Sequence, residues 1–368
     1  MATALIAMLV ATSSAGAASF SGGTAKLDFK GLKSAKQSNK GGTAAKNTFA
    51  FAENAGTATM NAQASGNLNI GSKNTAITLT RGGKSIVLQS LVQKLKSGKG
   101  VLSAKIKGKG KLIDFFDQAS SNRVSANADF TQLSMASSKM KLTKAGAAAL
   151  NKAFGLKGTA VYKAKAAAGT ASFTANRSLT VTGGSTRTVY DQKFVNDLRA
   201  CNIELGPVDP ATAIPKDPAS APEGGVQLPI NSQAGGTLNA QTLVGQVNHL
   251  GGTRLDRPAP GQPGNTTGKA EYHSPLSNFV FGLQGGALHT LTATIVNANN
   301  LSTNIGSVTG TPTKTLTDGP GKVALTGELL LSEAASGTLS QKAPPLGADC
   351  PIPPGSKIGS IVMDADVG

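Results

Sequence analysis

The chain has 368 residues, 39% of them hydrophobic, and a formal net charge of +17. This length is enough for one large or two ordinary domains with real cores. Trp is absent and Tyr occurs only 3 times, whereas Gly occurs 45 times, which excludes an aromatic-rich binding surface. Apolar and small polar residues alternate along most of the chain, and this pattern predicts a mainly β fold.

The N-terminus predicts a secretory signal peptide. ALIAMLVA at residues 4–11 is too short to span a bilayer, and Ala15-Gly16-Ala17 follows it as a small-x-small cleavage pattern. We therefore expect residues 1–17 to be removed and the protein to be secreted or extracellular, with cell-wall association as a further option. The usual positive segment before the apolar run is missing, which leaves the true start open. A buried N-terminal segment is the alternative interpretation.

The first half of the chain predicts strands followed by one helix. FAFAEN, ATMNAQ and NTAITLTRGGKSIVLQ alternate with period two between glycine-rich turns. LTKAGAAALNKAF at residues 142–154 has helical apolar spacing, with Thr143 as its N-cap. TASFTANRSLTVTG then returns to a strand pattern.

The second half begins with a predicted helix over residues 191–203, for which Asp191 is available as a cap. A Pro-rich connector at 207–225 and a Pro/Gly-rich surface loop at 256–268 interrupt the strands that follow. A last helix over residues 332–341 and a strand, KIGSIVMDADV, close the chain.

The chain contains only two cysteines, Cys201 and Cys350. In an oxidising compartment they form one disulfide, which would tie together the two ends of the second half. Two unrelated free thiols are the alternative, since two cysteines carry no spacing signature.

Similar phrases occur in the same order in both halves. The last two matched pairs have the same offset, because 291 − 102 and 331 − 142 both equal 189. We interpret the chain as two tandem homologous antiparallel β-rich modules, residues 18–188 and 189–368, each with one or two short helices. Chance similarity between two Ala/Gly-rich halves is the alternative. The matched pairs are TMNAQASGNLNIGS with TLNAQTLVGQVNHLGG, LSAKI with LTATI, and LTKAGAAALNK with LSEAASGTLSQ.

These modules resemble the Htaa domain, a haem-transport-associated domain of secreted and wall-attached proteins of high-GC Gram-positive bacteria. The outline GTLNAQTLVGQVNHLGGTRL, a strand pair ending in LTATI, and a strand leading into LTKAGAAALNKAF carry the resemblance. It implies an antiparallel β fold with two short helices, and a haem iron held by a Tyr that a nearby His supports. The Trp- and Phe-containing motif with which haem-binding members open is missing here.

Haem is the cofactor that this resemblance implies, and the second module offers the residue types for it. Tyr272 and His273, beside the predicted loop, are the most suggestive pair, and Arg254 and Arg257 would meet the haem propionates. The first module has no His and one Tyr, Tyr162. Solvated surface residues are the alternative interpretation of the histidines. The candidate ligand-binding residues are Tyr272, His273, His249, His289, Arg254 and Arg257.

Motifs for catalysis are missing: there is no G-x-S-x-G, no H-E-x-x-H, no phosphate-binding glycine loop, and no His and carboxylate cluster at metal spacing. We expect no catalytic residues, no metal site and no enzyme activity.

Charge is concentrated in the first half. Residues 1–185 hold 25 Lys and Arg against 5 Asp and Glu, a net of +20, whereas residues 186–368 hold 11 against 14, a net of −3. On a strand, Lys105, Lys107, Lys109 and Lys111 would line one face. An anionic cell-wall polymer or a membrane surface is the expected partner, and sequence-specific nucleic-acid binding is not expected. A lysine-guarded edge strand is the alternative.

Overall fold

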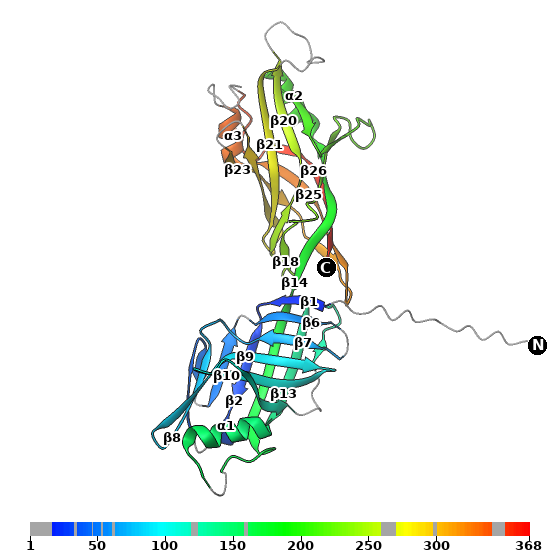
Figure 1. Cartoon of the computed structure of the whole chain (residues 1–368). Helices are drawn as coiled ribbons and strands as arrows, with labels where there is room; N and C mark the ends of the chain where they lie inside the picture. The colour runs from blue at the N-terminus through cyan, green and yellow to red at the C-terminus, as the bar shows by residue number, and fades with distance from the viewer. Residues whose placement is uncertain are drawn as a thin grey trace, which may run out of the picture. The chain divides into compact units, whose positions relative to one another are not determined.

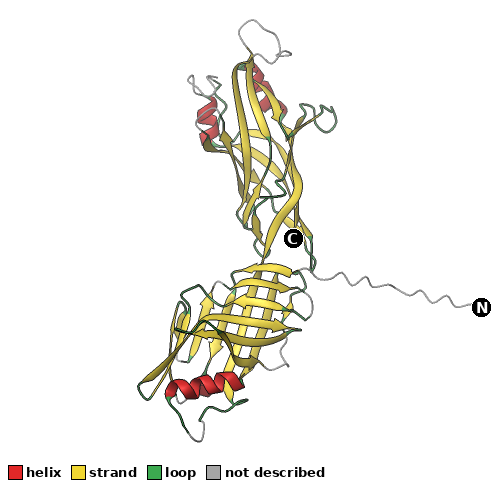
Figure 2. Cartoon of the chain, viewed as in Figure 1, coloured by secondary structure: helices red, strands yellow, loops and turns green. Residues whose placement is uncertain are grey.

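The structure is a computed structural model that describes residues 17–368 apart from 33–34, 46, 53, 61–62, 119–123, 158–160, 259–269, 297–299 and 341–349. The predicted signal peptide, except for Ala17, therefore lies outside the described residues. The chain divides into two compact units, residues 1–176 and 177–368. Both are built from antiparallel strands (Figures 1 and 2), which confirms the predicted mainly β fold. No helix among the described residues is long and apolar enough to cross a membrane.

Unit 1 is a curved antiparallel sheet system with one α-helix. Its core contains the contacting rings of Phe29, Phe49, Phe115 and Phe116. Its elements are β1 (Ala17–Ser21), β2 (Thr24–Asp28), a short 3-10 helix (Lys30–Leu32), β3 (Lys36–Lys40), β4 (Thr43–Ala45), β5 (Thr48–Ala52), β6 (Ala55–Thr59), β7 (Gly66–Asn69), β8 (Ala76–Arg81), β9 (Lys84–Lys96), β10 (Lys99–Ile106), β11 (Leu112–Gln118), β12 (Ser125–Ala126), β13 (Gln132–Leu142), α1 (Lys144–Phe154) and the first part of β14 (Ala167–Tyr190).

Unit 2 is likewise built from antiparallel strands, and it has two α-helices. Its core is aliphatic, with Phe194, Phe279 and Phe281 as its buried phenylalanines. Its elements are the second part of β14, α2 (Gln192–Ala200), β15 (Glu204–Val208), β16 (Thr212–Ile214), β17 (Gly225–Pro229), β18 (Thr237–Asn239), β19 (Gly245–Asn248), β20 (Gly252–Pro258), β21 (Ala270–Leu283), β22 (Leu288–Ile295), β23 (Leu301–Thr309), β24 (Thr313–Thr315), β25 (Gly321–Leu331), α3 (Glu333–Leu339) and β26 (Lys357–Val367).

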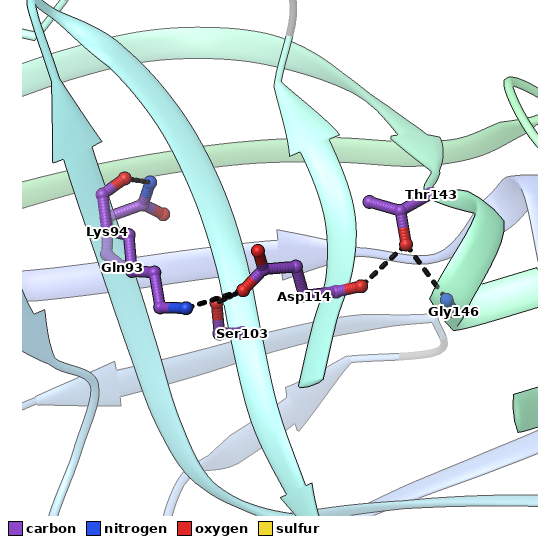
Figure 3. Close-up of polar contacts among 6 residues, drawn as sticks. All are labelled: Gln93, Lys94, Ser103, Asp114, Thr143 and Gly146. Atoms are coloured by element: carbon purple, nitrogen blue, oxygen red, sulfur yellow. Dashed lines mark hydrogen bonds and ion pairs between the residues drawn. The ribbon is translucent and has the colours of Figure 1, made fainter. Parts of the chain in front are cut away.

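The helices begin at side-chain caps that satisfy free backbone N–H groups. Thr143 Oγ1 accepts a hydrogen bond from the Gly146 N–H at 2.8 Å (Figure 3). Asp191 caps α2 and Ser332 caps α3 in the same way. The caps expected at Thr143 and Asp191 are therefore confirmed.

The strands of the two units pair in corresponding orders. In unit 1 the order is β1–β6–β7–β9–β10–β11–β13–β14–β2. In unit 2 it is β14–β18–β19–β21–β22–β23–β25–β26, and β26 pairs again with β14. The second part of β14 therefore occupies both ends of the strand order in unit 2, the positions that β1 and β2 occupy in unit 1.

A pair of glycines marks this correspondence. Gly22-Gly23 joins β1 to β2, and Gly183-Gly184 lies within β14. Gly23 and Gly184 both have positive φ, 97° and 110°. A Cβ at either position would lie 2.3 Å or 2.0 Å from a carbonyl oxygen of the neighbouring strand, so only glycine allows this approach.

The division between the units falls between Asn176 and Arg177, not after residue 188 as the sequence analysis placed it. The reason is strand continuity. Residues 178–190 of β14 continue the last strand of unit 1 but pair with β17, β18 and β26 of unit 2.

The expected connector at 207–225 is a structured part of unit 2. β15 pairs with β20, and β16 pairs with β17. In the expected loop at 256–268, Asp256–Pro258 belong to β20, and 259–268 lie outside the described residues.

Candidate ligand cavity

An apolar cavity lies inside unit 2, beside both of its helices. The free space in it that a water-sized sphere can occupy is about 80 Å³. Nine of the lining residues are large and apolar: Phe194, Leu205, Leu255, Leu276, Ile295, Ile305, Leu331, Leu339 and Ile358. An apolar lining with a few polar groups is typical of sites for small organic ligands.

Strand alternation explains the lining. Side chains at positions i and i+2 of a strand point to the same face. Thr253 and Leu255 of β20, Ser274 and Leu276 of β21, and Thr303 and Ile305 of β23 are such pairs, and all of them line the cavity. The helices close it with Phe194 from α2 and with Ala335, Thr338 and Leu339 from α3.

Tyr190 is the one phenol in the lining, and it lies at the end of β14. Its Oη lies 3.2 Å from Thr253 Oγ1. Thr253 Oγ1 donates its own proton to the Gly206 carbonyl at 3.1 Å, so the Tyr190 hydroxyl donates to Thr253. Burial raises the pKa of Tyr190 above its ordinary value, although the hydrogen bond with Thr253 acts in the opposite direction. The phenol is therefore neutral at physiological pH.

A disulfide joins the elements that wall the cavity. Cys201 ends α2, Cys350 precedes β26, and their Cα atoms lie 5.6 Å apart in the bonded pair. The Cys350 N–H also donates to the Leu339 carbonyl of α3 at 2.9 Å. The predicted disulfide is confirmed, and it links α2 to the chain just beyond α3.

His249 and His289 are buried and hydrogen-bonded through both ring nitrogens. His249 Nε2 lies 2.7 Å from Thr186 Oγ1, and its Nδ1 lies 3.2 Å from the Phe279 carbonyl. His289 Nδ1 accepts from the Gln284 N–H at 3.2 Å, and its Nε2 lies 3.1 Å from the Gly310 carbonyl. The alternative interpretation of these two as solvated residues is wrong, and neither lines the cavity.

The remaining candidates of the second module lie on β20 and β21. Tyr272 and His273 are strand residues of β21, not loop residues, and they pair with Arg257 and Asp256 of β20. The side chains of Tyr272 and His273 lie outside the described residues. Arg254 Nε contacts Asp256 Oδ2 at 2.7 Å. By alternation Arg254 lies on the face opposite to Thr253 and Leu255, whereas Arg257 shares their face.

The lysine run of unit 1 is mostly a turn. Lys105 lies in β10, but Lys107, Lys109 and Lys111 lie between β10 and β11. The expectation that all four line one strand face is therefore wrong. The strand β10 ends at Ile106. Gly108 has a φ of 79°, and glycines such as Gly108 and Gly110 favour turns over extended backbone.

At the position that corresponds to Tyr190 of unit 2, unit 1 has Phe29, which packs against other aromatic rings. Phe29 follows Gly22-Gly23 at the spacing at which Tyr190 follows Gly183-Gly184. The Phe29 ring lies 6.0 Å from that of Phe49 and 5.4 Å from that of Phe116. Tyr190 and Thr253 were not among the predicted site residues, and this repeated spacing after the glycine pair is the signal that could have found Tyr190.

The fold and the cavity define a class of protein: antiparallel β units, one of which encloses an apolar cavity. Solved structures similar to about half of this chain come from Corynebacterium glutamicum. The C-terminal domain of HtaA is 18% identical with a TM-score of 0.34, covering 52% of this chain and 99% of that chain. The haem-binding protein HtaB is 12% identical with a TM-score of 0.31, covering 52% and 96%.

A domain-swapped dimer of a variant of the same HtaA domain is 16% identical with a TM-score of 0.29, covering 48% of this chain and 91% of that chain. No protein-family model matches the sequence, and no curated protein matches it.

Proposed function

We propose that this protein is a non-enzymatic binding protein and that unit 2 holds haem in its apolar cavity, with Tyr190 as the iron ligand. The observation that carries the proposal is a cavity with apolar walls and one phenol, Tyr190, in its lining. The resemblance of the sequence to Htaa domains supplies haem as the ligand.

The lining residues are of the kinds that this ligand needs. Haem needs large apolar walls, which Phe194 and the leucines of the lining provide, and Tyr is one of the side chains that hold haem iron. Tyr190 would hold the haem iron through its Oη, and its hydroxyl proton would be lost to solvent. Thr253 fixes the direction of the hydroxyl group through its hydrogen bond. Arg257, on the cavity side of β20, is the proposed propionate partner.

His249 and His289 are not proposed as ligands. Each would have to break hydrogen bonds inside the protein to present a free nitrogen, and breaking a buried hydrogen bond is costly.

Hemin titration of the full chain, followed by absorbance, tests the proposal. We expect a shifted Soret band with the signature of a ferric tyrosinate complex. Tyr190→Phe, which removes only the hydroxyl, should lose that signature and weaken binding at least tenfold. Tyr272→Phe is the matched control and should bind like the parent. Retention of the tyrosinate signature in Tyr190→Phe together with its loss in Tyr272→Phe would assign the ligand to Tyr272 instead.

We also propose that the protein acts outside the cell. The disulfide between Cys201 and Cys350 supports this proposal, because stable disulfides belong to oxidising compartments. Recovery of the protein from culture medium with its N-terminus near Ala18 is the expected result, and purely cytoplasmic recovery would contradict it.

A further inference from the structure

Lysines of unit 1 gather at the end of the unit where α1 lies. We call this surface the α1 end and define it as α1, the β8–β9 hairpin tip, the β10–β11 turn and residues 161–165. Figure 1 shows β8, β10 and α1 at this end of the unit. These segments are far apart in sequence, so the cluster is a product of the fold.

Contacts fix the hairpin tip to the helix. A Cβ on Gly155, the C-cap of α1, would lie 2.3 Å from Lys84 Nζ, so the ammonium group of Lys84 sits at the negative end of the helix dipole. The Arg81 guanidinium lies over the Tyr162 ring at 5.7 Å. The side chain of Asn151 in α1 forms two hydrogen bonds with the backbone of Tyr162. Its Nδ2 donates to the Tyr162 carbonyl at 2.8 Å, and its Oδ1 accepts from the Tyr162 N–H at 3.1 Å.

The β10–β11 turn lies at the same end. The Lys107 N–H donates to the Val87 carbonyl of β9 at 2.9 Å, near the hairpin tip. Lys107, Lys109 and Lys111 are exposed. The start of α1 lies beside the start of β11, because Thr143 Oγ1 donates to the Asp114 carbonyl at 2.5 Å (Figure 3).

Carboxylates do not neutralise these lysines in the described part of unit 1. Asp114 binds Lys94 at 2.6 Å and Ser103 at 2.7 Å. Burial by itself raises the pKa of Asp114, but these hydrogen bonds outweigh it and lower the pKa below its ordinary value. The other ion pair among these residues joins Lys30 to Asp28. Neither pair includes a lysine of the α1 end.

We propose that the α1 end binds a flexible anionic polymer with closely spaced phosphate groups. Lysine ammonium groups suit phosphate as point charges. Val161 is the one exposed large apolar side chain among the described residues of unit 1, and Tyr162 is buried. The surface therefore has little apolar area to insert into a bilayer and no exposed aromatic ring on which bases could stack. This proposal concerns unit 1 and does not depend on haem binding.

The test uses long-chain sodium polyphosphate as the probe and two variants of the full chain. The first variant replaces Lys84, Lys107, Lys109, Lys111 and Lys152 of the α1 end by Gln. The control replaces five other exposed lysines by Gln and so makes the same change of charge: Lys26, Lys40, Lys73, Lys96 and Lys99. Of these, Lys96 and Lys99 form the opposite end of β9 and β10. All substituted side chains are exposed. Both variants should unfold cooperatively, the first at a slightly lower temperature because Lys84 no longer interacts with the α1 dipole.

We expect the first variant to bind polyphosphate at least tenfold more weakly than the parent in low salt, and the control to change less than threefold. The association constant for polyphosphate falls with salt, and the steepness of log K against log salt should decrease by roughly 3 in the first variant. Each lost phosphate contact contributes about 0.7 to this steepness for a flexible single strand. Equal weakening in both variants would show diffuse attraction and overturn the proposal. Binding to phosphatidylglycerol vesicles without binding to polyphosphate would overturn it in favour of a membrane surface.

Discussion

The hydrogen bonds of the two buried histidines fix their tautomers. A carbonyl oxygen only accepts, so His249 carries its proton on Nδ1 toward Phe279 and accepts from Thr186 on Nε2. His289 has the opposite tautomer, with its proton on Nε2 toward Gly310. Both side chains are therefore held neutral, and protonation of either would leave a charged ring in the core.

Unit 2 should lose stability in mild acid because of His249. Burial lowers the pKa of His249 to about 4 in the folded chain, whereas an unfolded His titrates near 6.5. The stability contributed by the neutral ring is fully present above about pH 6.5 and is lost as the pH falls toward 4. The destabilisation caused by His249→Gln should thus be about 2 kcal/mol smaller at pH 5 than at pH 7. Urea unfolding of both proteins at the two pH values measures it, and an equal cost at both would contradict the assigned pKa.

Residue-level prediction from sequence succeeded where the cause is local. Thr143 was identifiable as a cap because a cap needs only the residues that directly follow it. The spacing after the glycine pair could single out Tyr190, but its place in a cavity was not predictable, because the surrounding residues come from α2, α3 and strands far away in the sequence. The burial of His249 and His289 was likewise hidden, since Thr186, Phe279 and Gly310 reach them through tertiary pairing.

At the scale of elements, α2 and α3 decide whether the cavity stays formed. Phe194 of α2 and Leu339 of α3 both line it, and the disulfide links the end of α2 to the segment that follows α3. Ser336 Oγ also donates to the Ile352 carbonyl at 2.6 Å, which fixes the same segment. The walls of the cavity are thus joined covalently as well as by packing.

Removing the disulfide should destabilise unit 2 selectively. A crosslink that closes a long loop stabilises by about 2–5 kcal/mol, and here the two cysteines are 149 residues apart. Cys201→Ser with Cys350→Ser should lower the free energy of unfolding of unit 2 by that amount and speed the release of hemin. Unfolding of unit 1 should stay unchanged, because both cysteines lie in unit 2. Hydrogen exchange resolved by segment would separate the units, and equal losses in both would contradict the assignment.

Strand pattern predicted the elements better than their partners. The alternation in LSAKI and LTATI indicated β10 and β22 directly. The change of partner along β14 was not predictable, because period-two alternation does not specify which strand lies alongside. In the lysine run, the alternation of lysines predicts a strand, whereas Gly108 and Gly110 favour the turn that the structure has.

At the scale of the whole molecule, the chain holds two units with corresponding strand orders and different interiors and surfaces. In unit 1, Phe29 belongs to a core of contacting phenylalanine rings. The sequence of unit 1 carries most of the positive charge. Unit 2 has the cavity and Tyr190. The tandem origin of the units stays a prediction, and the corresponding pairing orders support it.

The location of iron in crystals of the full chain grown with hemin tests the central claim most directly. Anomalous scattering at the iron edge should give one strong peak per chain, inside unit 2 and within coordinating distance of Tyr190 Oη. Crystals of Tyr190→Phe should show that peak weakened or absent. A second peak in unit 1, or a single peak away from Tyr190, would contradict the account.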